Sequence, residues 1–345
     1  MDYQLSLNVR CALDLLEICP AYTQTPIVEI SPLNNIRLLI KDETNRMGLG
    51  SFKALGGIYA VAKFLLEQWE KENGSQLPAG RLTDPEIRSW SNKFTFVCAS
   101  AGNHGIAVAK GAELFNANSR VHIAHPVPAS FAQRLATLGA VVIRSGETYE
   151  ESMVAAMNDN SNGETLLADS SWPGYYHLPM LVMEGYTVIA EEMRQVFLHE
   201  DNWPTHVFLQ AGVGGLAASM AYEIRKNWKQ QPSIVVVEPL AAPCLFESYK
   251  RGRVTTVSGP ISSMGRLDCK EPSLIAFKLL KELADDFVCV SDEDALAAAD
   301  FLAQNKLATT ASGAAGLAAI LSNAKLDITI PDNSTCLVIA TEGSS

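Results

Sequence analysis

The sequence lacks the features that mark membrane, secreted and metal-binding proteins. Its seven cysteines are scattered and form no CxxC pair, which fits reduced thiols better than a disulfide framework or a zinc site. One long stretch without charge, residues 307–324, holds four hydroxyl residues and two glycines and is too polar to span a bilayer. The first twenty residues lack the long apolar segment that is typical of a signal peptide. We therefore expect a cytoplasmic protein without a metal site.

Positive charge is also scarce. Lys and Arg number 27 against 38 Asp and Glu, a net charge of −11. Nucleic acids and anionic membranes would repel such a chain, so neither is an expected partner. Hydrophobic residues make up 48% and charged residues 19% of the 345 positions, which predicts a packed globular protein of one or two domains.

Apolar β-rich runs alternate with segments of helical periodicity, a pattern typical of the α/β class with parallel sheets. Residues 71–92 contain two prolines and two glycines, and we expect them to form an irregular segment between two α/β units. The simplest organisation is two parallel-sheet α/β lobes with the active site in the cleft between them. Strands are expected at residues 36–40, 94–98, 119–123, 140–144, 206–209, 234–237 and 336–340. Helices are expected at residues 53–69, 104–115, 129–138, 150–157, 182–198, 216–228, 292–304 and 313–324.

A glycine-rich turn, QAGVGGL (residues 210–216), lies between an expected strand and an expected helix. Glycines at this position let backbone N–H groups approach a phosphate at the start of a helix. The spacing is neither the dinucleotide pattern GxGxxG nor a P-loop. The turn therefore predicts a phosphate cradle, with tight packing without a ligand as the alternative.

A second turn, CASAGNHG (residues 98–105), also joins a strand to a helix. Small residues and side-chain donors at a helix start suit a carboxylate or a ring oxygen. Alternatively, Ser100 or Asn103 only caps the helix, and His104 is structural.

The third feature is a lysine, Lys53, in KDETNRMGLGSFKALGG (residues 41–57). At the opening of a helix, the helix dipole and burial both favour a neutral amine, which Schiff-base chemistry requires. The alternative is a surface cation.

The order of these features resembles the tryptophan-synthase-β family of pyridoxal-phosphate enzymes, or fold type II. Further matching segments, DSSWPGYYHLPMLVMEGYT, VVVEP, MGRLDCKEP and TEG, are most similar to the diaminopropionate ammonia-lyase family. The resemblance covers almost the whole chain. It implies a large cofactor-binding lobe (residues 1–65 and 180–345) and a small substrate-binding lobe (residues 66–179), in a homodimer.

The resemblance implies a role for each matching residue. Lys53 would hold pyridoxal 5'-phosphate and, once freed, remove the Cα proton of the substrate. Asn103 would bond the 3' oxygen of the cofactor, and Thr341 would face the ring nitrogen. The loop around the cofactor phosphate would comprise Gly212, Val213, Gly214, Gly215 and Leu216.

The substrate carboxylate would lie at Ser100, Ala101 and Gly102, beside His104. Asp169 would hold the distal amine of diaminopropionate and help it to leave as ammonia, and Tyr175 would line the pocket. Alternatively, Asp169 caps a turn and Tyr175 only packs.

The sequence departs from the family pattern at four places. Ala101 stands where the lyase usually has an aspartate, the base expected for D-isomers, and Ala311 stands where related enzymes commonly have a glutamate. Arg266 and Asp268 stand where the family pattern has small residues. These two side chains either reshape the pocket for another β-substituent or are charges of a solvated loop. The sequence ends at Ser345, where the family usually continues, so we expect a shortened form or a missing subunit contact.

These features together predict a carbon–nitrogen lyase that eliminates ammonia from L-2,3-diaminopropionate, or a close β-substituted L-amino acid, to give pyruvate. A serine or threonine dehydratase is the second hypothesis, because the loop ASAGNH resembles that of dehydratases. The third is an inactive cofactor-binding homologue that acts as a sensor or partner subunit. A yellow cofactor band and loss of turnover on replacing Lys53 would distinguish an enzyme from a sensor.

Overall fold

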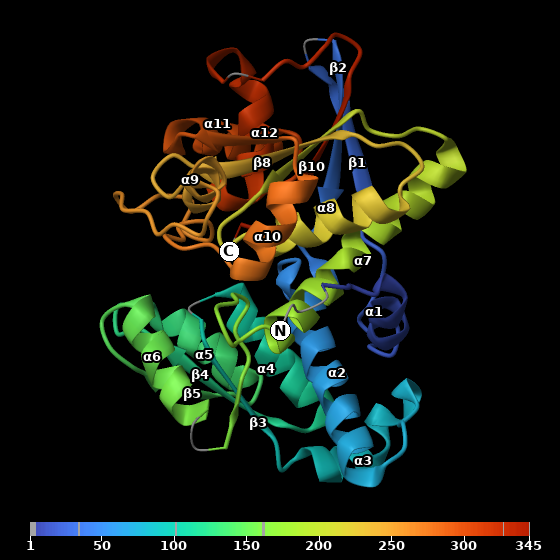
Figure 1. Ribbon diagram of the computed structural model, residues 1–345, viewed down its shortest axis with the longest axis vertical. Coiled ribbons are helices and arrows are strands. Elements are labelled where there is room, and N and C mark those ends of the chain that lie inside the picture. The colour runs from blue at the N-terminus through green and yellow to red at the C-terminus, as the bar shows by residue number, and fades with distance from the viewer. Residues whose placement is uncertain (1–4, 34, 101, 161–162, 327, 345) are drawn as a thin grey trace.

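The computed structural model describes residues 5–344 except 34, 101, 161–162 and 327. Ala101, expected at the substrate carboxylate, therefore lies outside the described residues. The chain forms two β-sheets, and helices surround both (Figure 1). The upper part of the figure holds the larger sheet, and the lower part holds the smaller one.

The larger sheet has six strands in the order β1-β2-β10-β7-β8-β9. Each neighbouring pair is parallel except β1 and β2, which form an antiparallel edge. Central strands such as β8 are rich in valine and buried along almost their whole length, as expected for a sheet covered on both faces. The strands are β1 (Ile27–Leu33), β2 (Ile36–Asp42), β7 (His206–Gln210), β8 (Ser233–Pro239), β9 (Asp286–Val290) and β10 (Thr335–Ala340).

The smaller sheet has four parallel strands in the order β5-β4-β3-β6. Its central strand β3 ends at the turn CASAGNHG, so the helix after that turn begins at the carboxyl edge of the sheet. Ligands of open parallel sheets bind at this edge. The strands are β3 (Thr95–Ala99), β4 (Asn118–Ile123), β5 (Val141–Arg144) and β6 (Thr165–Leu166).

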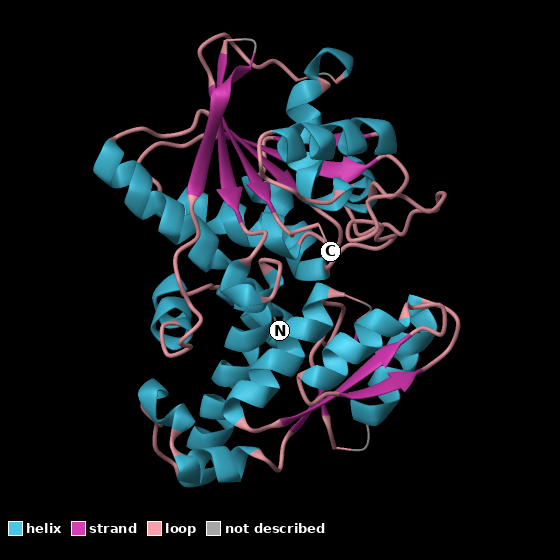
Figure 2. Cartoon of the chain, turned by 180° about the vertical axis from the view of Figure 1, so that it is seen from behind, coloured by secondary structure: helices cyan, strands magenta, loops and turns pink. Residues whose placement is uncertain are grey.

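Helices cover both faces of each sheet, as the view from behind shows (Figure 2). The 3₁₀ segments are η1 (Arg46–Gly48), η2 (Ala79–Thr83) and η3 (Asn323–Lys325). The first group of helices is α1 (Val9–Leu16), α2 (Lys53–Asn73), α3 (Pro85–Ser91), α4 (Asn103–Phe115), α5 (Ala129–Thr137) and α6 (Tyr149–Asn160). The second group is α7 (His177–Glu200), α8 (Gly215–Asn227), α9 (Cys244–Arg251), α10 (Leu274–Leu283), α11 (Asp292–Gln304) and α12 (Ala311–Leu321).

Two long helices, α2 and α7, pack against each other. In Figure 1, α2 lies in the lower part of the molecule and α7 extends from the middle into the upper part. Glycine permits this close contact, because a Cβ added at Gly185 of α7 would lie 2.7 Å from the carbonyl oxygen of Leu55. Likewise, a Cβ at Gly57 would lie 2.5 Å from the Cβ of Ala107 in α4. Helix α2 is thereby fixed between α7 and α4, and its first residue, Lys53, has a defined position.

The predicted fold class is confirmed. Every predicted strand and helix corresponds to an element of the structure. The reading of residues 71–92 as irregular is wrong in part, because α3 begins there at Pro85, a residue suited to a first helical turn. The expected boundaries between lobes at 65/66 and 179/180 fall inside α2 and α7. The assignment of residues to lobes stays a prediction.

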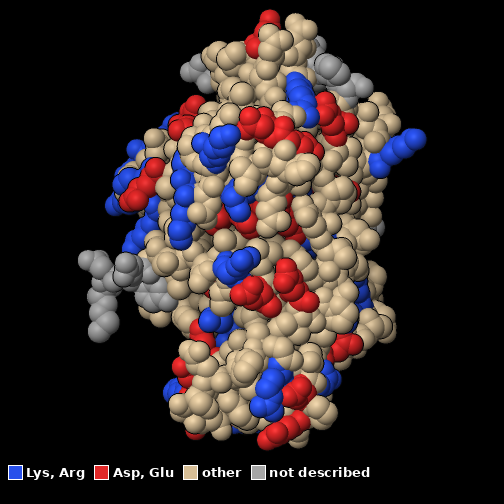
Figure 3. Space-filling view, turned by 90° about the vertical axis from the view of Figure 1, so that its right-hand side faces the viewer, with Lys and Arg blue, Asp and Glu red and all other residues tan. Residues whose placement is uncertain are grey.

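Acidic and basic side chains are interspersed over the face of the molecule drawn in Figure 3. This mixed pattern gives no single-sign field on that face for steering a polyanion. Among the described residues, no helix combines the length and the apolar character needed to cross a membrane.

Candidate active site

Lys53 is the first residue of α2, directly after the segment that follows β2. Its backbone N–H donates to the Ser51 hydroxyl at 3.3 Å, and its Nζ lies 2.5 Å from Oδ2 of Asp169. The two side chains are 23% and 19% exposed. The structure therefore brings together two predicted site residues that lie 116 positions apart.

The ion pair determines the charge of the lysine. Burial by itself would lower the pKa of Lys53, but the Asp169 carboxylate outweighs burial and raises this pKa above its ordinary value. Burial would raise the pKa of Asp169, and Lys53 instead holds it below its usual range. The expected neutral amine is therefore not found while Lys53 is paired with Asp169, because residue spacing does not reveal which carboxylate lies beside the lysine.

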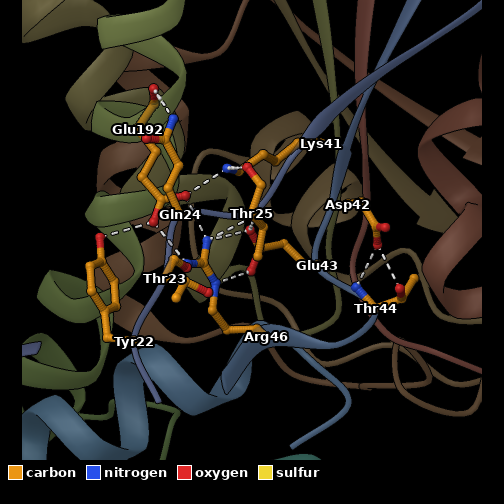
Figure 4. Close-up of polar contacts among 10 residues, drawn as sticks. All are labelled: Tyr22, Thr23, Gln24, Thr25, Lys41, Asp42, Glu43, Thr44, Arg46 and Glu192. Atoms are coloured by element: carbon orange, nitrogen blue, oxygen red, sulfur yellow. Dashed lines mark hydrogen bonds and ion pairs between the residues drawn. The ribbon is translucent and has the colours of Figure 1, made fainter. Parts of the chain in front are cut away.

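A buried ion-pair network supports the segment that leads to Lys53 (Figure 4). Arg46 contacts Glu43 at 2.6 Å and Glu192 at 2.8 Å, and Lys41 lies 2.6 Å from Glu192. Tyr22 donates its hydroxyl to Glu192 at 3.0 Å. Two cations balance two carboxylates here, so the network joins β2, η1 and α7 without leaving a net buried charge.

The glycine turn 210–216 runs from β7 into α8. Gly214 has φ of +97°, and a Cβ there would lie 2.9 Å from Leu245. A Cβ at Gly212 would lie 2.9 Å from the sulfur of Cys269. Side chains at these two positions would clash or strain the turn, so the turn requires glycine there. The turn leads into the N-terminus of α8, where a phosphate cradle is expected.

The cradle lies beside the lysine. A Cβ added at Gly215 would be 3.8 Å from the carbonyl oxygen of Asp169 and 3.9 Å from the ring of Tyr186. Val213 and Leu216, the other predicted cradle residues, flank these glycines in the same turn.

Thr341 follows β10, and its carbonyl accepts the N–H of Phe52, the residue before Lys53, at 3.1 Å. Its buried hydroxyl lies 3.4 Å from the amide nitrogen of Gln210, at the start of the glycine turn. Gln210 thus connects the predicted ring-nitrogen partner to the predicted cradle, although sequence analysis gave it no role.

The substrate loop begins at Ser100, whose hydroxyl accepts the N–H groups of Gly102 at 3.2 Å and Gly105 at 3.0 Å. These bonds match the capping alternative for Ser100. His104 is buried, with Nε2 2.8 Å from the Leu167 carbonyl. Burial lowers its pKa, and its Nδ1 has no partner among the described residues. A neutral ring with one free nitrogen is therefore available next to the loop.

Asn103, the first residue of α4, donates its side-chain amide to the carboxylate of Glu342. The hydroxyl of Thr310 donates to the same carboxylate at 2.6 Å. Sequence analysis missed Glu342, although the TEG motif contains it. Thr310 directly precedes Ala311, so Glu342 contacts the residue next to position 311.

Tyr175 uses its hydroxyl within the protein. The group donates to the Leu166 carbonyl at 2.7 Å and accepts the N–H of Ala168 at 3.1 Å. The ring stacks on Trp172 with 4.4 Å between centroids. These contacts favour the packing alternative, in which Tyr175 fixes the segment that leads to Asp169.

Tyr186 is a second residue that sequence analysis missed. It is 1% exposed, and the Nζ of Lys53 lies 5.7 Å from its ring centroid. Among the described residues its hydroxyl has no hydrogen-bond partner within 3.5 Å, and Lys53 is the cation beside it. The side chain lies between α2 and α8, since added Cβ atoms at Gly56 and Gly215 would both approach its ring. A buried hydroxyl without a close partner, beside the lysine and the glycine turn, fits a site built for a polar cofactor.

Comparison with known proteins agrees with this geometry. The sequence model of the family described as "Pyridoxal-phosphate dependent enzyme" matches residues 18–342. Diaminopropionate ammonia-lyase of Salmonella typhimurium is 33% identical over 298 residues, which cover 82% of this chain and 73% of the relative. L-threonine ammonia-lyase of Geobacter sulfurreducens is 29% identical, over 67% of this chain and 55% of that protein.

A solved structure of the Escherichia coli diaminopropionate ammonia-lyase in complex with D-serine superposes with a TM-score of 0.87. It is 25% identical, and the match covers 99% of this chain and 92% of the other. Pyridoxal phosphate is thus the cofactor, as predicted. The chain belongs to the pyridoxal-phosphate-dependent enzymes, in the group that includes the diaminopropionate ammonia-lyases.

Proposed function

We propose that the protein catalyses α,β-elimination from L-2,3-diaminopropionate, or a close β-substituted L-amino acid. With one water, diaminopropionate gives pyruvate and two ammonia. The observation that carries this proposal is the 2.5 Å ion pair between Lys53 and Asp169 beside the glycine cradle. This contact supports the roles that we propose for the two residues, a lysine that transfers a proton and a carboxylate that holds a cationic leaving group.

Each of the proposed cofactor-binding residues would contact a different part of the cofactor. Lys53 would hold it covalently, and the turn from Gly212 to Leu216 would receive its phosphate at the N-terminus of α8. Asn103 would bond the 3' oxygen, and Thr341 would face the ring nitrogen. When bound, pyridoxal 5'-phosphate supplies an electron sink for the pair left at Cα of the substrate.

The protein's own groups would then position the substrate and move protons. Ser100, Ala101, Gly102 and His104 would receive the carboxylate at the start of α4. The freed Lys53 amine would take the Cα proton, and Asp169 would hold the β-ammonium group until the Cβ–N bond breaks and ammonia leaves with the bond electrons.

Replacing Asp169 with asparagine tests this assignment. We expect kcat/KM for L-2,3-diaminopropionate to fall about 100-fold more than kcat/KM for L-serine, because only the amine substrate needs the carboxylate's charge. Pyruvate release in a coupled assay measures both. Asp201→Asn is the matched control, since it changes an exposed Asp–Lys pair of 3.0 Å on the surface. Equal losses on both substrates would support the dehydratase hypothesis instead.

We also expect turnover of L-isomers only. Removal of the Cα proton from a D-isomer requires a base on the opposite face, and position 101 supplies a methyl group in place of a carboxylate. The measurement is pyruvate release from L- and D-2,3-diaminopropionate at equal concentration. Comparable rates on the two isomers would contradict this expectation.

Replacing Tyr186 with phenylalanine should weaken cofactor binding about tenfold while leaving the cofactor-free protein as stable or more stable. The reason is that the substitution removes a buried hydroxyl that has no partner within 3.5 Å among the described residues and would bond a polar group of the cofactor. Equilibrium titration with pyridoxal 5'-phosphate and thermal unfolding of the cofactor-free protein give the two quantities. Unchanged cofactor affinity would show that this hydroxyl serves no ligand.

The proposal also includes the oligomeric state and the cellular location of the protein. We propose a cytoplasmic homodimer, supported by the resemblance to the family and by the unpaired cysteines. The division into a cofactor lobe (1–65 and 180–345) and a substrate lobe (66–179) is supported by the strands, since each sheet draws all its strands from one of these sets. Sedimentation of the holoenzyme tests the oligomeric state.

A further inference from the structure

A cavity of about 200 Å³ lies next to the substrate loop. Its lining includes Asn103, Phe131 and Arg134 from one side and Arg266, Thr310 and Glu342 from the other. Neither Lys53 nor Asp169 is among the residues that line it. A group that enters this cavity is therefore contacted by side chains other than Lys53 and Asp169.

Arg266 forms one wall of the cavity. Its backbone N–H donates to the Ser312 hydroxyl at 3.1 Å, which fixes the segment before α10. Its guanidinium carbon lies 5.3 Å from the ring centroid of Phe131 and 3.1 Å from the position of a Cβ at Gly102. A side chain at Gly102 would thus collide with Arg266, and the guanidinium lies directly on the substrate loop.

The guanidinium of Arg266 has spare donors. Its one ion pair, between Nε and Oε2 of Glu342, spans 3.6 Å, and the side chain is 40% exposed. Among the described residues its guanidinium donates no hydrogen bond within 3.5 Å. Glu342 already accepts shorter hydrogen bonds from Asn103 and Thr310.

Arg134 supplies a second cation from α5. One of its terminal nitrogens donates to the Leu49 carbonyl at 2.8 Å, which leaves the other N–H groups for a ligand. Two arginines and one carboxylate, that of Glu342, line the cavity, so these side chains carry one net positive charge. Arginines with free planar donors are suited to a carboxylate or phosphate.

We propose that this cavity binds an anionic group at the far end of the substrate's β-substituent. Of the substrates proposed above, the preferred one is then a β-substituted L-amino acid whose leaving group ends in a carboxylate or a phosphate, and not 2,3-diaminopropionate itself. This inference rests on the proposed β-elimination and narrows its substrate class. Asp169 would still face the atom bonded to Cβ, and Arg266 and Arg134 would hold the charge beyond it.

O-phospho-L-serine illustrates the chemistry. Lys53 takes the Cα proton, the C–H pair becomes the Cα–Cβ double bond, and the Cβ–O pair leaves with phosphate. With one water the balance is pyruvate, ammonia and phosphate. O-succinyl-L-serine reacts likewise and releases succinate, so the two substrates distinguish a phosphate from a carboxylate ligand.

The test compares these two substrates with neutral β-chloro-L-alanine on the holoenzyme. We expect Arg266→Gln to lower the ratio of kcat/KM for the better anionic substrate to that for β-chloro-L-alanine about 10- to 100-fold. Arg266→Lys should recover part of the ratio, because it restores the charge without the planar donors. Arg81→Gln, which removes an equal charge from an exposed pair with Asp84, should leave the ratio unchanged.

A binding measurement separates this inference from the proposed function. Calorimetric titration of O-phospho-L-serine into the Lys53→Ala variant measures binding without turnover. We expect the additional substitution Arg266→Gln to lower the affinity about tenfold. No pyruvate from any substrate would overturn β-elimination, and the titration would still decide whether the cavity binds an anion. Pyruvate from β-chloro-L-alanine, with equal ratios in wild type and Arg266→Gln, would overturn the anion cavity alone.

Discussion

Replacing Lys53 with alanine is expected to lower kcat/KM for elimination from L-2,3-diaminopropionate about 10⁴-fold or more. The variant loses both the covalent attachment of the cofactor and the amine that removes the Cα proton, and a single positioned base already accounts for factors up to about 10⁴. Continuous pyruvate release, coupled to lactate dehydrogenase, measures this loss.

Lys53→Arg is the informative control. It keeps a cation opposite Asp169, whose ion pair with Lys53 spans 2.5 Å, but a guanidinium cannot form an imine with the cofactor aldehyde. We therefore expect Lys53→Arg to be as inactive as Lys53→Ala and more stable, because alanine leaves the Asp169 carboxylate without its partner. Turnover of Lys53→Arg above about one per cent of the wild-type rate would contradict covalent catalysis by this residue.

Replacing Arg46 with methionine is expected to lower the free energy of unfolding by about 3–5 kcal/mol, since it leaves two buried carboxylates without their main cation. The side chains of Arg46 and Glu43 are fully buried, and that of Glu192 is 4% exposed. Burial disfavours the charged form of Arg46, but Glu43 and Glu192 together raise its pKa. Chemical denaturation with and without cofactor measures the loss.

A surface pair provides the comparison for Arg46. Arg81 lies 2.8 Å from Asp84, with exposures of 51% and 40%, and Arg81→Met should cost less than about 1 kcal/mol. Equal small losses for Arg46→Met and Arg81→Met would show that the network of Figure 4 contributes little to stability.

The network also makes the free energy of unfolding decrease at low pH. Burial would raise the pKa of Glu192, but Arg46 and Lys41 hold it below its ordinary value. An acid with a lowered folded pKa stabilises the protein fully above its unfolded pKa, and this contribution is lost as the pH falls through the folded pKa.

The sequence predicted the parallel core well, because buried central strands read as valine- and isoleucine-rich runs. It did not predict β1, whose run contains Pro32, or β9, a short strand that begins at the exposed residue Asp286. Both lie at an edge of the larger sheet. An edge strand is less completely buried than a central strand, so its sequence does not need to be a continuous apolar run. Helix α10 was missed although its apolar spacing is visible in the sequence.

The site was predictable where a local motif carries the chemistry and not where distant segments meet. The glycine turn, the loop before α4 and Lys53 each lie at a helix start that the sequence indicates. The contact of Lys53 with Asp169 joins residues on different elements, and the resemblance alone pointed to Asp169. The roles of Glu342 and Tyr186 depend on packing between helices and loops, which residue spacing does not record.

The most direct test of this account is chemical trapping of the cofactor on the holoenzyme. Reduction with sodium borohydride, followed by proteolysis and mass spectrometry, locates the lysine that carries the pyridoxyl group. The account predicts one modified peptide, with the group on Lys53. A pyridoxyl group on another lysine, or an unmodified protein, would contradict it.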